Sequence, residues 1–142
     1  MLFRSLPDDL SWLMPRALRA SEIRSMIEDF AKSAQRLQRC GFSGVEISGG
    51  HGHLFHQFLS PWSNARDDQY GGDVAGRTRL VAEMIAVVRA ACGNDFILGL
   101  KLPGDDGVPG GIGPDEAARI AVHLTAPKTI DYITFAQGSH AR

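Results

Sequence analysis

Hydrophobic positions near the start of this chain follow a helical period and then give way to a short apolar run. Between Ser21 and Gly41, apolar side chains return every three or four residues, at Ile23, Met26, Ile27, Phe30, Ala31, Ala34 and Leu37. This spacing is typical of one face of an amphipathic helix. Ser21 is the predicted N-cap of this helix, and Gly41 supplies the left-handed residue that commonly ends one. The run at 45–47 predicts a strand.

The alternation of helix and strand continues to the end of the chain. The pattern predicts a second helix around residues 80–88 that closes at Gly93, and then an apolar strand at 96–102. Pro114 suits the first position of a third helix, which runs toward residue 124, and a third strand is predicted at 132–136. Strands that alternate with helices predict parallel pairing. Strands that are apolar on both faces predict a sheet covered on both sides.

Two architectures fit this order: a section of a β/α barrel, or a small open doubly wound sheet. Residues 48–75 show no sustained period, and a stretch of about 28 residues without regular structure is usually functional. Loops at the carboxyl ends of barrel strands build active sites. We therefore predict an α/β fold, a section of a TIM (β/α)8 barrel with about three parallel strands and alternating helices. The domain is predicted at 21–142, after an irregular lead-in at 1–20.

Composition and charge narrow the possible partners. The chain has 142 residues, 44% of them hydrophobic and 22% charged, which is the balance of a globular protein with a core. A net charge of −1 gives no electrostatic reason to bind nucleic acid, and we see neither a membrane span nor the apolar core of a signal peptide. Cys40 and Cys92 lack metal-ligand spacing, so we expect reduced thiols and a cytoplasmic protein.

Titratable side chains crowd the point where the chain leaves its first strand. His51, His53 and His56 follow that strand within nine residues of Ile47. With Glu46 they could form a zinc or iron site of a metal-dependent barrel hydrolase, although such a site needs further ligands from other strands. The glycines at 49, 50 and 52 lack the spacing of a phosphate-binding loop, so we interpret them as a tight exit from the strand.

The run from Gly41 to Arg79, GFSGVEISGGHGHLFHQFLSPWSNARDDQYGGDVAGRTR, closely resembles a segment of the old yellow enzyme or NADH:flavin oxidoreductase family. These are FMN-dependent β/α-barrel enzymes, and trimethylamine dehydrogenase and 2,4-dienoyl-CoA reductase have related barrels. The likeness spans nearly the whole chain, because 45–47, 96–102 and 130–138 resemble the fourth, fifth and sixth barrel strands. It implies that this chain is the middle section of such a barrel. It also implies hydride transfer through flavin N5 to or from a small organic substrate, with NADH or NADPH as possible electron donor.

The resemblance assigns a role to four residues of this chain. In the family, an H-x-x-H/N-x-Y set after the fourth strand polarises the substrate and delivers a proton. Ser48, His51 and His53 stand at these positions, and only His51 matches the family's choice. His51 would hold a substrate oxygen or nitrogen, Ser48 would assist, and His53 would relay a proton. Lys101 stands where the family places a cation that stabilises the reduced flavin, on the strand face of Ile97 and Gly99.

Several alternatives stay open. Because Ser48 and His53 differ from the family's residues at their positions, ene reduction and the oxidation of N-methylated amines both remain possible reactions. A non-catalytic fragment that self-associates and binds no flavin is a further possibility, and its partner would be a second copy of the chain. If the chain is instead part of a longer barrel, its partner would be the remainder of that barrel. We interpret the loop motif Asn64-x-Arg66-x-Asp68-x-Tyr70, with the two glycines that follow, as structural. We expect His56 to be a solvated residue.

Overall fold

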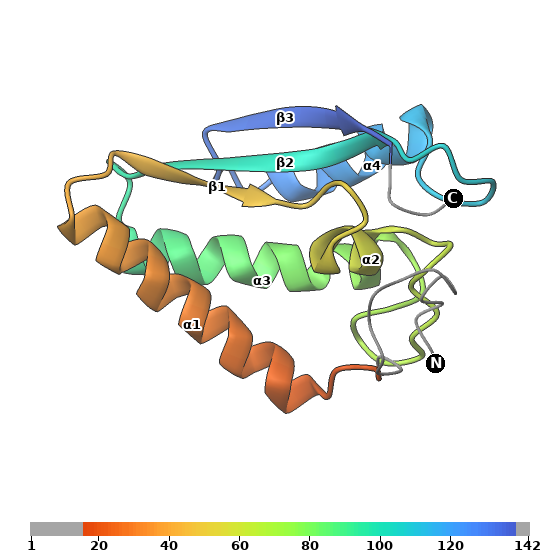
Figure 1. The fold of residues 1–142 in the computed structure, drawn as a ribbon, viewed down its shortest axis with the longest axis horizontal. Helices are drawn as coiled ribbons and strands as arrows, with labels where there is room; N and C mark the ends of the chain where they lie inside the picture. Colours follow the sequence, from red (N-terminus) through yellow and green to blue (C-terminus); the bar gives the residue numbers. More distant parts are fainter. Residues whose placement is uncertain (1–15, 139–142) are drawn as a thin grey trace, which may run out of the picture.

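The protein is an α/β fold in which three strands lie over a layer of helices (Figure 1). The computed structural model describes residues 16–138, so most of the predicted lead-in, residues 1–15, lies outside the described residues. The elements in chain order are α1 (Ala20–Arg39), β1 (Gly44–Ser48), α2 (Leu54–Leu59), α3 (Val74–Cys92), β2 (Ile97–Asp105), α4 (Pro114–Thr125) and β3 (Tyr132–Gln137). The predicted alternation of helices and strands is confirmed, with the short helix α2 as an additional element.

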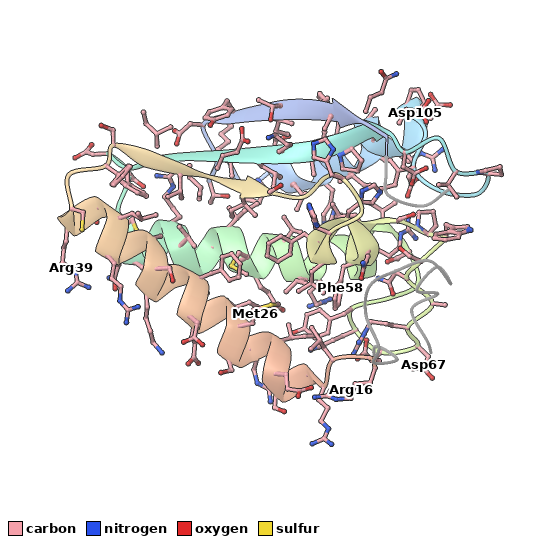
Figure 2. All side chains as sticks on the ribbon, in the orientation of Figure 1. Arg16, Met26, Arg39, Phe58, Asp67 and Asp105 are labelled. Atoms are coloured by element: carbon pink, nitrogen blue, oxygen red, sulfur yellow. The ribbon has the colours of Figure 1, made fainter. Side chains whose placement is uncertain are left out.

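The three strands form one parallel sheet in the order β1-β2-β3, as the alternation predicted. Their register aligns Ser48 of β1 with Lys101 of β2, and Lys101 with Thr134 of β3. All three strands therefore run toward the same edge of the sheet. Asp105 marks that end of β2 in Figure 2.

Only one face of this sheet is covered by the helices of the described residues. Leu98, Leu100 and Leu102 are 0% exposed and face the core that α1, α3 and α4 complete. On the opposite face, Ile97 and Tyr132 remain 47% and 43% exposed. The expectation of a sheet covered on both sides is therefore wrong for residues 16–138. The uncovered face also carries polar side chains, which continuous apolar runs would not predict.

Some element boundaries differ from those predicted, for local physical reasons. The N-cap of α1 is Arg19 rather than Ser21, because the Glu22 carboxylate accepts a hydrogen bond from the Arg19 N–H at 2.7 Å. The helix predicted around 80–88 is α3, and it begins well before residue 80. The Asp73 side chain accepts a hydrogen bond from the Gly76 N–H and caps this helix. Gly93 and Pro114 end and begin their helices as predicted.

The long polar segment is less irregular than predicted, because it contains α2 and is fastened at several points. The Asn64 amide donates to the carbonyls of Phe58 and Tyr70 at 2.6 and 2.8 Å. Arg66 pairs with Asp68 at 2.5 Å. A side chain at Gly71 would place its Cβ 2.1 Å from the Arg66 carbonyl oxygen, so only glycine fits there. These contacts support the structural interpretation of the loop motif.

Candidate functional site

The predicted site residues lie on or beside the carboxyl edge of the sheet. Ser48 is the last residue of β1, and His51 and His53 lie in the turn that follows it. Lys101 is level with Ser48 in the register, but it lies inside β2 because that strand continues to Asp105. The prediction that residue 102 ends the strand is therefore wrong. Ser48, His51 and His53 are exposed, and Lys101 is half-buried.

The turn after β1 follows the close path that its glycines predicted. The Gly49 N–H donates to the Lys101 carbonyl at 2.7 Å. A Cβ on Gly49 would lie 2.7 Å from that oxygen, which would push the two strands apart. His51 then adopts φ of 60° and Gly52 φ of 77°. A left-handed backbone at a residue with a side chain is uncommon and is favoured at functional sites.

His56 is buried, so the expectation of a solvated residue is wrong. It is 3% exposed, and its ring contacts two different loops. Its Nδ1 accepts a hydrogen bond from the Gly52 N–H at 2.9 Å, which leaves the proton of the neutral ring on Nε2. Nε2 lies 3.4 Å from a carboxylate oxygen of Asp106, a residue 5% exposed in the loop after β2. Burial lowers the pKa of His56, against the opposing effect of Asp106.

Glu46 joins the three strands on the uncovered face. Its carboxylate lies 3.2 Å from the Lys101 ammonium and accepts a hydrogen bond from the Thr134 hydroxyl at 3.1 Å. The ring of Tyr132 lies against Gly99, where an added Cβ would be 2.2 Å from the ring. Partial burial and the neighbouring Glu46 carboxylate raise the pKa of Tyr132. These contacts of Glu46 could not be predicted from the sequence, because they depend on the register between strands.

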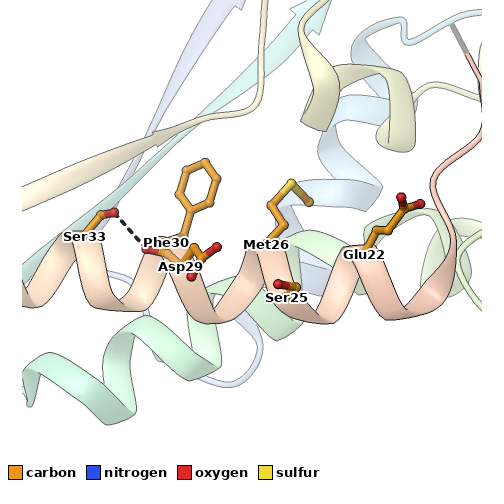
Figure 3. A pocket seen from close by; sticks show the side chains of 6 residues that line it. All are labelled: Glu22, Ser25, Met26, Asp29, Phe30 and Ser33. Carbon is orange, nitrogen blue, oxygen red and sulfur yellow. Dashed lines mark hydrogen bonds between the residues drawn. The ribbon is translucent and has the colours of Figure 1, made fainter.

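No metal centre in the described residues accounts for the histidines. Within residues 16–138, no group of three or more His, Cys, Asp or Glu side chains could hold a metal ion. A hollow of about 470 Å³ lies along α1 instead (Figure 3). Its lining includes Met26 and Phe30 but none of the predicted site residues. No helix in the described part of the chain is long and apolar enough to cross a membrane.

Lys101 and the small residues beside it could accept one side of a flavin ring. Lys101 presents an ammonium whose side chain is 35% exposed, next to the small residues Gly49 and Gly50. A side chain on Gly50 would contact Ala136 at 3.4 Å and reduce the space over Lys101. The residues present therefore leave room for a planar group beside the Lys101 ammonium, which is paired with Glu46. Described residues that sequence reasoning missed at this edge are Gln57 and Asp106.

The fold corresponds to a section of a β/α barrel, with polar side chains toward the carboxyl ends of its strands. Residues 6–139 match the family described as "NADH:flavin oxidoreductase / NADH oxidase family". The chain belongs to this family, which confirms the predicted family and the predicted barrel section.

Two curated relatives and one solved structure illustrate the similarity. The chain is 39% identical over 117 residues to the N,N-dimethylglycine/sarcosine dehydrogenase of Chromohalobacter salexigens, covering 82% of this chain and 17% of that protein. It is 36% identical over 130 residues to the NADH-dependent flavin oxidoreductase nadA of Aspergillus parasiticus, covering 92% and 29%. The old yellow enzyme homologue from Zymomonas mobilis superposes with a TM-score of 0.79 at 26% identity, covering 96% of this chain and 39% of that one. The chain thus spans less than a third of the length of either curated relative.

Proposed function

We propose that this chain is the site-bearing middle section of an FMN-dependent oxidoreductase that acts on a small organic substrate, with NADH or NADPH as electron donor. Family membership supports this proposal. The structural observation that supports it is the register that aligns Ser48, the last residue of β1, with Lys101 of β2. His51 and His53 follow Ser48 in the turn after β1. Bound FMN would supply two-electron transfer at its N5 atom.

The residues of the chain would orient the substrate and stabilise charge. His51 would donate a hydrogen bond to a substrate oxygen or nitrogen, with the Ser48 hydroxyl as a second, shorter donor. His53 would hold a proton for transfer at its ring nitrogen. Lys101 would stabilise negative charge on the pyrimidine side of FMN, and its ion pair with Glu46 would fix the position of its ammonium.

Oxidation of a small N-methylated amine is the second candidate reaction. Ser48 and His53 replace the usual histidine and tyrosine of the ene-reducing members, so the set that activates an electron-poor double bond is incomplete here. A relative that is 39% identical is named as a dehydrogenase of N,N-dimethylglycine and sarcosine. Turnover with a series of secondary and tertiary methylamines, compared with activated alkenes, separates the two reactions.

Flavin and metal content test the proposal against its rivals. The intact protein that contains this chain should purify with visible flavin absorbance and release FMN on denaturation. A colourless protein with stoichiometric zinc would support the hydrolase instead. A colourless protein without metal would support a fragment that has no catalytic role. The two free cysteines, Cys40 and Cys92, support the further proposal of a cytoplasmic location.

We also infer that the isolated 142-residue chain associates with itself through the uncovered face of its sheet. Ile97 and Tyr132 are half exposed there, and β1 and β3 are both edge strands within the described residues. Apolar surface and unpaired edges promote association. Sedimentation should show a dimer or larger species that Ile97→Glu weakens. Val122→Glu on α4 is the control, since Val122 is 70% exposed on the helical side. A compact monomer at micromolar concentration would contradict this inference.

A further inference from the structure

The left-handed backbone conformation of His51 is unfavourable for a residue with a side chain, so contacts from other residues must stabilise it. At φ of 60° its Cβ crowds its own backbone, and the following residue, Gly52, is also left-handed at 77°. Such a backbone persists when the surrounding contacts determine it. The contacts that do so come from α2, one turn further along the chain.

Two neighbouring side chains of α2 hold the Gly52 residue from both of its polar groups. The Nδ1 of His56 accepts from the Gly52 N–H at 2.9 Å, and the side-chain amide of Gln57 donates to the Gly52 carbonyl at 2.8 Å. Both side chains are at least half-buried, so water competes weakly for these bonds. The Gly52 backbone is therefore fixed in position and in orientation.

His56 is in turn held by the loop that follows β2. Asp106 accepts from Nε2 of His56 and from the Ser60 hydroxyl, each at 3.4 Å, and from the Ile112 N–H at 2.8 Å. Its other oxygen accepts from the Val108 N–H at 2.9 Å. These backbone donors orient the carboxylate whether or not His56 is present. The turn after β1 is thus tied to the loop after the strand that carries Lys101.

We propose that His56 and Gln57 are positioning residues that hold His51 in its left-handed conformation beside the sheet edge. They do so by binding both polar groups of Gly52, and Asp106 in turn holds His56 in place. The inference rests on the proposed function only in taking His51 as the residue that contacts substrate. The roles of His56 and Gln57 in the backbone geometry are independent of any flavin.

The tautomer of His56 and the exchange of one amide test the proposal in the 142-residue chain. Nitrogen NMR of the labelled chain at neutral pH should show Nδ1 unprotonated and Nε2 protonated. The Gly52 amide should exchange with deuterium more slowly than its intrinsic rate. A His56 ring with its proton on Nδ1, or a Gly52 amide that exchanges at the intrinsic rate, would overturn the proposal.

Variants separate this role from a general contribution to folding. His56→Leu should accelerate Gly52 exchange about tenfold relative to the amides of β2, as expected for one lost hydrogen bond. His56→Asn should restore most of the protection, because its carbonyl oxygen can replace Nδ1 as acceptor. Equal exchange at Gly52 in these two variants, or equal loss at Gly52 and in β2, would contradict positioning.

A matched pair of glutamine variants supplies the control. Gln57→Met should accelerate Gly52 exchange a few-fold. Gln38→Met removes an equivalent bond, from the Gln38 amide to the Cys92 carbonyl at 2.8 Å, and should leave Gly52 unchanged. If His56→Leu does not fold, this pair and the wild-type tautomer decide the outcome. Since no readout involves flavin, failure here would leave the proposed function untouched, and a flavin-free protein would leave this inference standing.

Discussion

Replacing Arg77 should destabilise the chain more than replacing any exposed arginine. Arg77 is 7% exposed, and its Nε donates to the Leu59 carbonyl at 3.0 Å. Its other nitrogens donate to the Gly72 carbonyl and to Glu116, so one side chain joins α2, the polar loop and α4. Arg77→Met keeps most of the apolar stem and removes all of these bonds.

The Glu116 carboxylate sets the size of this effect. Its side chain is 14% exposed, and its remaining cationic partner is Arg119 at 3.3 Å, which is 68% exposed. Removing one partner of a buried ion pair costs about 3–5 kcal/mol. Because Arg119 can still neutralise part of the charge, we expect a loss near the lower end, about 3 kcal/mol.

Urea unfolding at a fixed protein concentration measures this loss. Arg79→Met is the control on the same helix, since Arg79 is exposed and makes one bond, to the Gln69 carbonyl at 2.9 Å. Its free energy of unfolding should change by less than about 0.5 kcal/mol. Adding Glu116→Gln to Arg77→Met should recover part of the stability. A loss below about 1 kcal/mol for Arg77→Met, or equal losses for the two arginines, would refute this reasoning.

The remaining predictions concern pH and the flavin. The pKa of His56 is lowered in the folded chain. As the pH falls below about 6.5, His56 therefore becomes protonated in the unfolded chain before it does so in the folded chain. The free energy of unfolding should therefore decrease below that pH, with His56 contributing at most about 1.4 kcal/mol per pH unit. His56→Asn should lack this contribution in urea titrations between about pH 7.5 and 5. Equal dependence of the free energy of unfolding on pH in the two proteins would contradict the prediction. In the intact flavoprotein, Lys101→Met should lower the flavin reduction potential, because the reduced ring loses a neighbouring cation. Glu46→Gln should raise the potential, because it removes a nearby negative charge. An unchanged potential in both variants would mean that Lys101 lies away from the ring.

The order of elements and the strand edge could be predicted because they follow from short-range patterns. Alternating periods identified the strands, and parallel pairing then predicted that Ser48 and Lys101 lie toward the same edge of the sheet. The contacts of His56 could not be predicted in this way. The six residues of α2 are too few for periodicity to distinguish a buried face from a solvated one. A solvated His56 is therefore what the sequence predicts.

Contacts that depend on register were also inaccessible from the sequence. Glu46 meets Lys101 and Thr134 only because three strands align in one particular register. Asp106 meets His56 across 50 positions of the chain. The N-cap of α1 was misplaced because Ser21 is the more favourable capping residue, while Glu22 stabilises Arg19 in that position.

Turnover and flavin content of a His51→Ala variant of the intact protein test the central claim most directly. In the proposed function His51 contacts the substrate and is not one of the groups that hold FMN. We therefore expect turnover to fall about 10²–10³-fold, the usual cost of losing one charge-stabilising donor, while FMN stays stoichiometric. Loss of FMN in proportion to activity, or full activity without the His51 side chain, would contradict the claim that this strand edge polarises the substrate.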